Sequence, residues 1–323
     1  MNPDSDSDGP PTKRQRTEPE PTRSDIWHAD GSVVLEADAT QFRVHWSVLA
    51  LHSSLFRDLR DRPQSPDHPR IEGCPVVQLS DTSRDLKHLL DALYDPLLFS
   101  GESLPFQLIS SVIRMGRKYG FKKLLDAAVG RLAYENPTTL AAHDAMPCPN
   151  PSGAYESTRI EHYPGIVFDM ITLAQANSLY TILPCAYSRA FQSQELILDG
   201  IAYPNGVCIT ISPLDQKALV LGRKKILQAQ WEAPYPWTML SADAASPACT
   251  DNAGCITMRK IILRGALESG TLLVLRRATK PTGFCAACEA DYLEAMAQGR
   301  RELWERLPTF FGLPPWDELK NDL

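Results

Sequence analysis

Residues 42–59, with the sequence FRVHWSVLALHSSLFRDL, decide the fold of the N-terminal part of this chain. The stretch indicates the end of a strand that continues directly into one amphipathic helix. Apolar residues recur at the spacing of a single helical face, formed by Val48, Leu51, Leu55, Phe56 and Leu59. Before it, two short apolar runs on either side of a polar turn at residues 36–40 predict two strands. A hairpin followed by one helix leaves an apolar face uncovered, so later elements must pack against it.

The segment up to residue 135 supplies those elements. A strand is predicted at residues 76–79, followed by helices at 84–94, 104–119 and 121–132. Pro96 and Gly120 end the first two of these helices. We therefore expect a small α/β domain over residues 24–135, large enough for one core.

The order of these motifs resembles the BTB/POZ interaction domain. The segments FRVH (42–45), VLA (48–50) and SSLF (53–56) are similar to the signature of that family, and VQLSD (77–81) with LLDALY (89–94) is similar to its next strand and helix. The resemblance implies an α+β fold in which a small mixed sheet is flanked by helices. It also implies a protein that dimerises and recruits other proteins.

The rest of the chain is predicted to be a linker and a helical domain. Prolines interrupt any helical or strand-like apolar periodicity in residues 136–163, which we therefore expect to be the linker. Residues 164–323 carry several amphipathic patterns and are predicted to form a mostly α-helical C-terminal domain. The ending LPTFFGLPPWDEL (307–319) resembles the one shared by the BTB proteins that are expanded in mushroom-forming fungi. We expect this proline-stiffened ending to lay its apolar residues on the helical domain: Phe311, Leu313, Trp316 and Leu319. A peptide-docking motif is the alternative.

Three functions are compatible with the resemblance. The first is a non-enzymatic scaffold that acts through BTB dimerisation and partner recruitment. The second is a substrate adaptor of a cullin-type ubiquitin ligase, and the third is a zinc-dependent nuclear regulator that works with corepressors. Against the adaptor, the loop at residues 60–73 lacks the hydrophobic-x-Glu element of cullin-binding members, and no substrate-reading domain is recognisable. Trp46 also stands where the family usually has a basic residue, which puts a charged pocket there in doubt.

The predicted interaction surface combines the N-terminal strand with the first helix. It includes Ile26 and Trp27, which emerge from a polar tail, and His45 and Trp46 at the corner between strand and helix. Docking of Ile26 and Trp27 on their own domain is an equally weighted alternative. His45 is expected to hydrogen-bond to backbone rather than to act as a base.

Composition excludes several other classes. A net charge of −6 gives no basic face for direct nucleic-acid binding, and no apolar run is long enough to span a membrane. The N-terminus lacks the apolar segment of a secretory signal, and eight cysteines without secretory context indicate a reducing compartment. We therefore expect an intracellular protein, in the nucleus or the cytoplasm.

Residues 1–23 are acidic and rich in proline, and are predicted to be a disordered tail. A basic cluster within the tail is a candidate nuclear-localisation signal, formed by Lys13, Arg14 and Arg16. The alternative is a charge cluster that only solvates the tail.

Two pairs of cysteines form the one candidate metal site. Cys285-x2-Cys288 has the spacing of half a zinc site, at the start of a helix whose dipole favours thiolate. Cys249-x5-Cys255 has a longer spacing than the usual pair, and no histidine lies near it in the sequence. Structural zinc is one reading, and four buried cysteines that act as small apolar residues are the other.

Catalytic motifs are absent from the sequence. There is no Gly-x-Ser-x-Gly, no glycine-rich phosphate loop and no His-Glu-x-x-His. The seven histidines are scattered along the chain. We therefore predict that the protein is not an enzyme and binds no catalytic cofactor.

Overall fold

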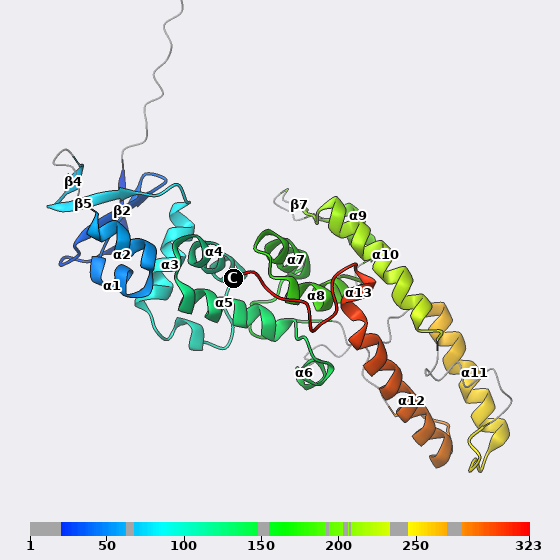
Figure 1. Ribbon diagram of the computed structural model, residues 1–323. Coiled ribbons are helices and arrows are strands. Elements are labelled where there is room, and N and C mark those ends of the chain that lie inside the picture. The colour runs from blue at the N-terminus through cyan, green and yellow to red at the C-terminus, as the bar shows by residue number, and fades with distance from the viewer. Residues whose placement is uncertain are drawn as a thin grey trace, which may run out of the picture. The chain divides into compact units, whose positions relative to one another are not determined.

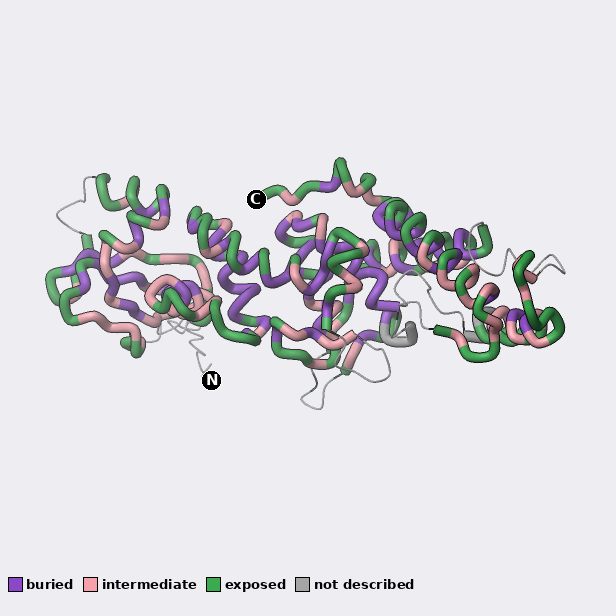
Figure 2. Tube along the Cα trace, turned by 90° about the horizontal axis from the view of Figure 1, so that it is seen from below, coloured by how far each residue is buried: buried purple, intermediate pink, exposed green. Residues whose placement is uncertain are grey.

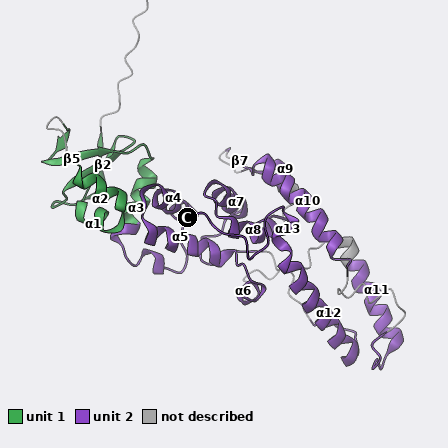
Figure 3. Ribbon diagram, viewed as in Figure 1, with its two compact units in different colours: residues 1–91 green, residues 92–323 purple. Residues whose placement is uncertain are grey.

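The computed structural model describes residues 21–62, 68–147, 155–191, 194–202, 206, 208–232, 245–269 and 280–323 (Figure 1). The chain divides into two compact units, residues 1–91 and 92–323, which Figure 3 draws in different colours. Lys13, Arg14 and Arg16 lie outside the described residues.

The first unit contains a five-stranded mixed sheet of order β1-β3-β2-β5-β4. Its strands are β1 Thr22–Trp27, β2 Val33–Ala37, β3 Thr40–Val44, β4 Arg70–Ile71 and β5 Cys74–Gln78. The predicted hairpin is β2 and β3, which pair antiparallel across a tight turn where Asp38 and Ala39 both have positive φ. β1 pairs with β3 in parallel, and so does β5 with β2. The pattern of residues 33–44 thus predicts the centre of the sheet, but β4 carries no comparable signal.

Two helices and most of a third complete this unit: α1 Trp46–His52, α2 Ser54–Asp61 and α3 Ser83–Tyr94, of which residues 83–91 belong to it. The prediction of one continuous helix after β3 is wrong, because Ser53 has an extended backbone (φ −136°, ψ 124°) that separates α1 from α2. The Oγ atom of Ser53 accepts a hydrogen bond from the Phe56 amide at 3.1 Å and so begins a second helix. This break changes which residues face inward. The core buries Leu49, Ala50 and Phe56, whereas Leu51 is 70% exposed and Leu55 is 39% exposed.

The second unit is mostly helical. It contains α4 Phe106–Tyr119, α5 Lys122–Glu135, α6 Leu140–Ala145, α7 Ile166–Ala176, α8 Leu183–Ala190, α9 Gln194–Asp199, α10 Pro213–Ala229, α11 Asn252–Ser269, α12 Ala286–Glu305 and α13 Leu307–Phe310. Two 3-10 turns, Leu98–Ser100 and Tyr180–Ile182, and a short β6 Ile201–Ala202 and β7 Cys208–Ile209 pair complete it. Gly120 ends α4 at the predicted position, in the left-handed conformation. Ser212 caps α10, because its side chain accepts a hydrogen bond from the Asp215 amide.

One continuous apolar core joins most of these helices, from α4 and α5 through α7, α8 and α10 to α13. The predicted packing of the chain's ending is confirmed. Phe311 and Leu319 are buried, and Leu313 and Trp316 pack against the same core. Burial is sparse in α11 and in the first half of α12, at the right-hand end of Figure 2, where intermediate and exposed residues predominate. No helix among the described residues is long and apolar enough to cross a membrane.

Candidate functional site

The predicted residues of β1 lie at the edge of the sheet. Ile26 and Trp27 are both half-buried. Trp27 packs against a small apolar cluster of its own unit, formed by Val34, Cys74 and Val76, and the Arg23 guanidinium lies 4.5 Å from the centre of its ring. Because β1 is the terminal strand of the sheet order, its backbone is paired with β3 on one side only.

The corner between β3 and α1 holds His45 and Trp46. The Nε2 atom of His45 lies 3.2 Å from the Asp30 carboxylate, so this side chain contacts an acid at the corner. A hydrogen bond from His45 lowers the pKa of Asp30. The Trp46 amide donates to Ser32 Oγ at 3.0 Å, and the Trp46 ring lies 6.4 Å from that of Phe56. These contacts hold the start of α1 against the hairpin.

Two leucines that the sequence pattern assigned to the core instead face solvent. Leu51 is at the end of α1 and Leu55 is in the first turn of α2, on either side of the break at Ser53. Val48 and Leu59 on the same helices are half-buried. Sequence reasoning missed this surface because the pattern of residues 48–59 fits one helix as well as two. The signal that could have found it is Ser53-Ser54, since serine is a preferred capping residue.

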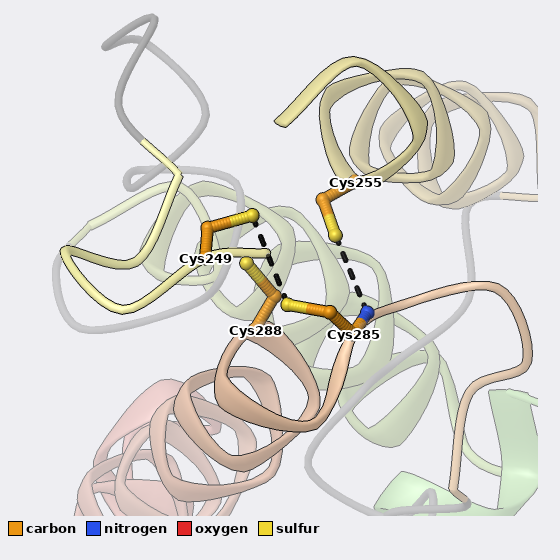
Figure 4. A group of neighbouring side chains, drawn as sticks. All are labelled: Cys249, Cys255, Cys285 and Cys288. Carbon is orange, nitrogen blue, oxygen red and sulfur yellow. Dashed lines mark hydrogen bonds between the residues drawn. The ribbon is translucent and has the colours of Figure 1, made fainter. Parts of the chain in front are cut away.

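The four predicted cysteines come together in the second unit (Figure 4). Cys249 precedes α11, Cys255 lies in its first turn, Cys285 immediately precedes α12 and Cys288 lies in the first turn of α12. All four sulfur atoms are within 4.8 Å of one another. The Sγ atoms of Cys249 and Cys285 are 3.7 Å apart, and the backbone N–H of Cys285 donates to Cys255 Sγ at 3.3 Å.

The electrostatic surroundings of these thiols differ. Backbone hydrogen bonds, from Cys288 first and then Thr250, lower the pKa of Cys285 to about 5. Desolvation raises the pKa of Cys249 to about 12. The Cys285 sulfur is therefore favoured as a thiolate, whereas the other thiols would have to lose their protons before they could bind a cation.

Arg259 also belongs to this site, and sequence reasoning missed it. Its Nη2 atom lies 3.9 Å from Cys288 Sγ, and the residue is only 8% exposed. Arg259 follows Cys255 by four residues on α11, so both side chains leave the same face of the helix. That spacing is the sequence signal that could have identified it.

Comparison with known proteins identifies the N-terminal part of the chain. No curated protein and no solved structure matches the chain. The model of the BTB/POZ domain family matches residues 28–135, which include β2 to β5 and α1 to α5. Residues 28–135 are therefore a BTB/POZ domain, a module that generally mediates protein–protein interaction and dimerisation.

Proposed function

We propose that this protein is a non-enzymatic scaffold that forms a homodimer through its BTB/POZ domain and recruits other proteins. The observation that carries the proposal is the outward position of Leu51 and Leu55 in a domain of this class. The mechanism is surface complementarity, without a chemical step.

The first argument for self-association is energetic. Complete burial of an exposed leucine side chain stabilises association by about 1.5–3 kcal/mol. Leu51 is 70% exposed, so its burial in a dimer would gain most of that free energy, and Leu55 at 39% exposure would gain a smaller share. A two-fold dimer presents each residue twice, so a single pair of leucines contributes four buried side chains to the interface.

The second argument concerns β1. It is an edge strand, and its apolar Ile26 and Trp27 are half-buried. An edge strand can extend its hydrogen bonding to a second chain. We infer that Ile26 and Trp27, together with Leu51 and Leu55, belong to the dimer surface, whereas His45 and Trp46 hold α1 in place behind it.

The deciding experiment is a mass measurement by light scattering on the full chain at micromolar concentration. We expect twice the 35.9 kDa chain mass for the natural protein and a single chain mass for the double variant Leu51→Glu with Leu55→Glu. Leu97→Glu is the matched control, because Leu97 is 72% exposed but lies outside the proposed surface. A monomeric natural protein, or a double variant that stays dimeric, contradicts the proposal.

The recruited partners are identified by affinity purification from the protein's own cells. A cullin that is lost when residues 28–135 are removed would make the protein a ubiquitin-ligase adaptor. Corepressors, together with nuclear retention that requires Lys13, Arg14 and Arg16, would make it a nuclear regulator. If neither a cullin nor corepressors are found among the partners, the protein remains a self-associating scaffold.

A further inference from the structure

We propose that Cys249, Cys255, Cys285 and Cys288 bind one zinc ion in a closed four-thiolate site, and that this ion attaches α11 to the start of α12. The proposal is independent of dimerisation, because the site lies in the C-terminal unit, outside the BTB/POZ domain.

The first support is geometric. With zinc–sulfur bonds of about 2.3 Å, a tetrahedral site places its sulfur atoms about 3.8 Å apart. Cys249 Sγ and Cys285 Sγ are already 3.7 Å apart, and no pair of the four exceeds 4.8 Å. In Figure 4 the four side chains point toward a common centre from α11, α12 and the residues just before each helix. Small side-chain rotations therefore suffice to complete the coordination.

The second support is electrostatic. A zinc ion with four thiolates carries a surplus of two negative charges, which burial would penalise without compensation. The Arg259 guanidinium at Cys288 Sγ supplies a positive charge in a buried position. Both α11 and α12 begin at the cluster, and the N-terminus of each helix contributes a further partial positive charge. The Cys285 amide donates directly to a ligand sulfur. This environment suits an anionic metal centre.

The third support is the weak apolar packing of α11. Over residues 252–265 the only buried side chains are those of Cys255 and Arg259, while Ile261 is 57% exposed. A helix of this length normally buries an apolar stripe. Here the two residues that α11 buries over this range are Cys255, a candidate ligand, and Arg259, whose guanidinium lies beside Cys288 Sγ. Within residues 252–265, Leu263 is the one partly buried hydrophobic that packs against the unit's core, so the metal would add the attachment that apolar contacts provide elsewhere in the unit.

The number of ligands also defines the type of site. Four cysteines fill a tetrahedral zinc ion and leave no position for water or substrate, which makes the site structural rather than catalytic. Arg259 is a positioning residue, since it contacts a ligand and not the ion.

The experiment measures zinc by elemental analysis in the full chain, purified without chelator. We expect one zinc per chain, and a loss of that zinc in the double variant Cys285→Ser with Cys288→Ser. Cys208→Ser is the control, because Cys208 is exposed and outside the cluster, and this variant should keep its zinc. Replacement of zinc by cobalt should give the absorption of a tetrahedral cobalt thiolate, which reports the ligand set directly.

Two further measurements separate metal binding from general folding. Chelation of the natural protein should open residues 245–300 to limited proteolysis while residues 28–135 stay resistant, and added zinc should restore protection. Arg259→Gln should weaken zinc affinity about tenfold, and Arg259→Lys should recover most of it. Zinc-free protein in which all eight cysteines titrate as thiols, an intact mass that reveals two disulfides, or zinc that persists in the double serine variant would each overturn the proposal.

Discussion

Arg300 of α12 forms a two-pronged ion pair with Asp144 of α6, with nitrogen–oxygen distances of 2.9 and 2.7 Å. Arg300 is almost completely buried, and one turn later the Trp304 indole donates to the Thr138 carbonyl at 3.0 Å. Together these contacts join two helices that lie far apart in the sequence.

Replacement of Arg300 by alanine should therefore destabilise the C-terminal unit by about 2–3 kcal/mol. This is less than the full cost of breaking a buried pair, because Asp144 is partly exposed. Arg300→Lys should cost less, since it keeps the charge but loses the second hydrogen bond. Chemical denaturation followed by circular dichroism measures both. Arg301→Ala is the matched control, because the exposed ion pair of Arg301 with Glu294 should contribute no more than about 1 kcal/mol. Equal losses of stability from Arg300→Ala and Arg301→Ala would contradict the prediction.

Acid should weaken the same junction through His143. Burial lowers the pKa of His143 from 6.5 to about 4. Between these values the unfolded chain binds a proton that the folded chain does not, so stability is complete above pH 6.5 and falls as the pH drops toward 4. The expected loss between pH 7 and pH 4.5 is on the order of 2 kcal/mol.

The test compares unfolding of the natural protein and of His143→Asn across that pH range. The variant should lose less stability on acidification, because asparagine does not titrate. Parallel pH dependences for the two proteins would show that another group is responsible.

Glu135 should be one of the most sensitive positions in the C-terminal unit. Its carboxylate is completely buried and accepts hydrogen bonds from the amides of Thr158 and Arg159 at 2.9 and 2.7 Å and from the Tyr155 hydroxyl at 2.9 Å. Glu135→Ala leaves these donors without their acceptor and should cost about 3–5 kcal/mol. Glu135→Gln keeps one acceptor and should cost less. Chemical denaturation measures the change in unfolding free energy. Glu161→Ala is the control, because Glu161 is exposed and its replacement should have little effect. A loss below about 1 kcal/mol for Glu135→Ala would contradict the prediction.

Gly222 on α10 allows Phe311 of the ending to pack closely. A Cβ atom at residue 222 would lie 2.4 Å from Phe311 Cδ1, and Phe311 also contacts the rings of Tyr187 and Phe191. Gly222→Ala should therefore destabilise the unit by about 1–3 kcal/mol through overpacking. Gly130→Ala is the control within α5, where nothing lies within 4 Å of the new Cβ. It should stabilise by about 0.5–1 kcal/mol, so the two substitutions should shift the thermal midpoint in opposite directions.

Much of the BTB/POZ domain and of the cysteine site is predictable from sequence. Buried Val33, Val34 and Leu35 mark a central strand, and Cys285-x2-Cys288 marks half of the four-cysteine cluster, because both signals are local. The break at Ser53 has one local signal, the capping pair Ser53-Ser54, but it stands inside a pattern that fits one continuous helix as well as two. The spacing of Arg259 from Cys255 places both on one helical face, but the contact of Arg259 with Cys288, which lies 29 residues further along the chain, does not follow from that spacing.

The last residues of the chain have a consequence for its synthesis. Arg117 pairs with Asp322 across 205 residues, Asn321 accepts two hydrogen bonds from Thr181, and the Trp316 indole donates to the Trp304 carbonyl. Chains fold from the N-terminus as they leave the ribosome, so the parts of the Tyr187 and Phe191 rings that contact Phe311 stay uncovered until residue 311 has emerged. A nascent chain arrested before that point would expose this surface, and it would be held by chaperones or degraded.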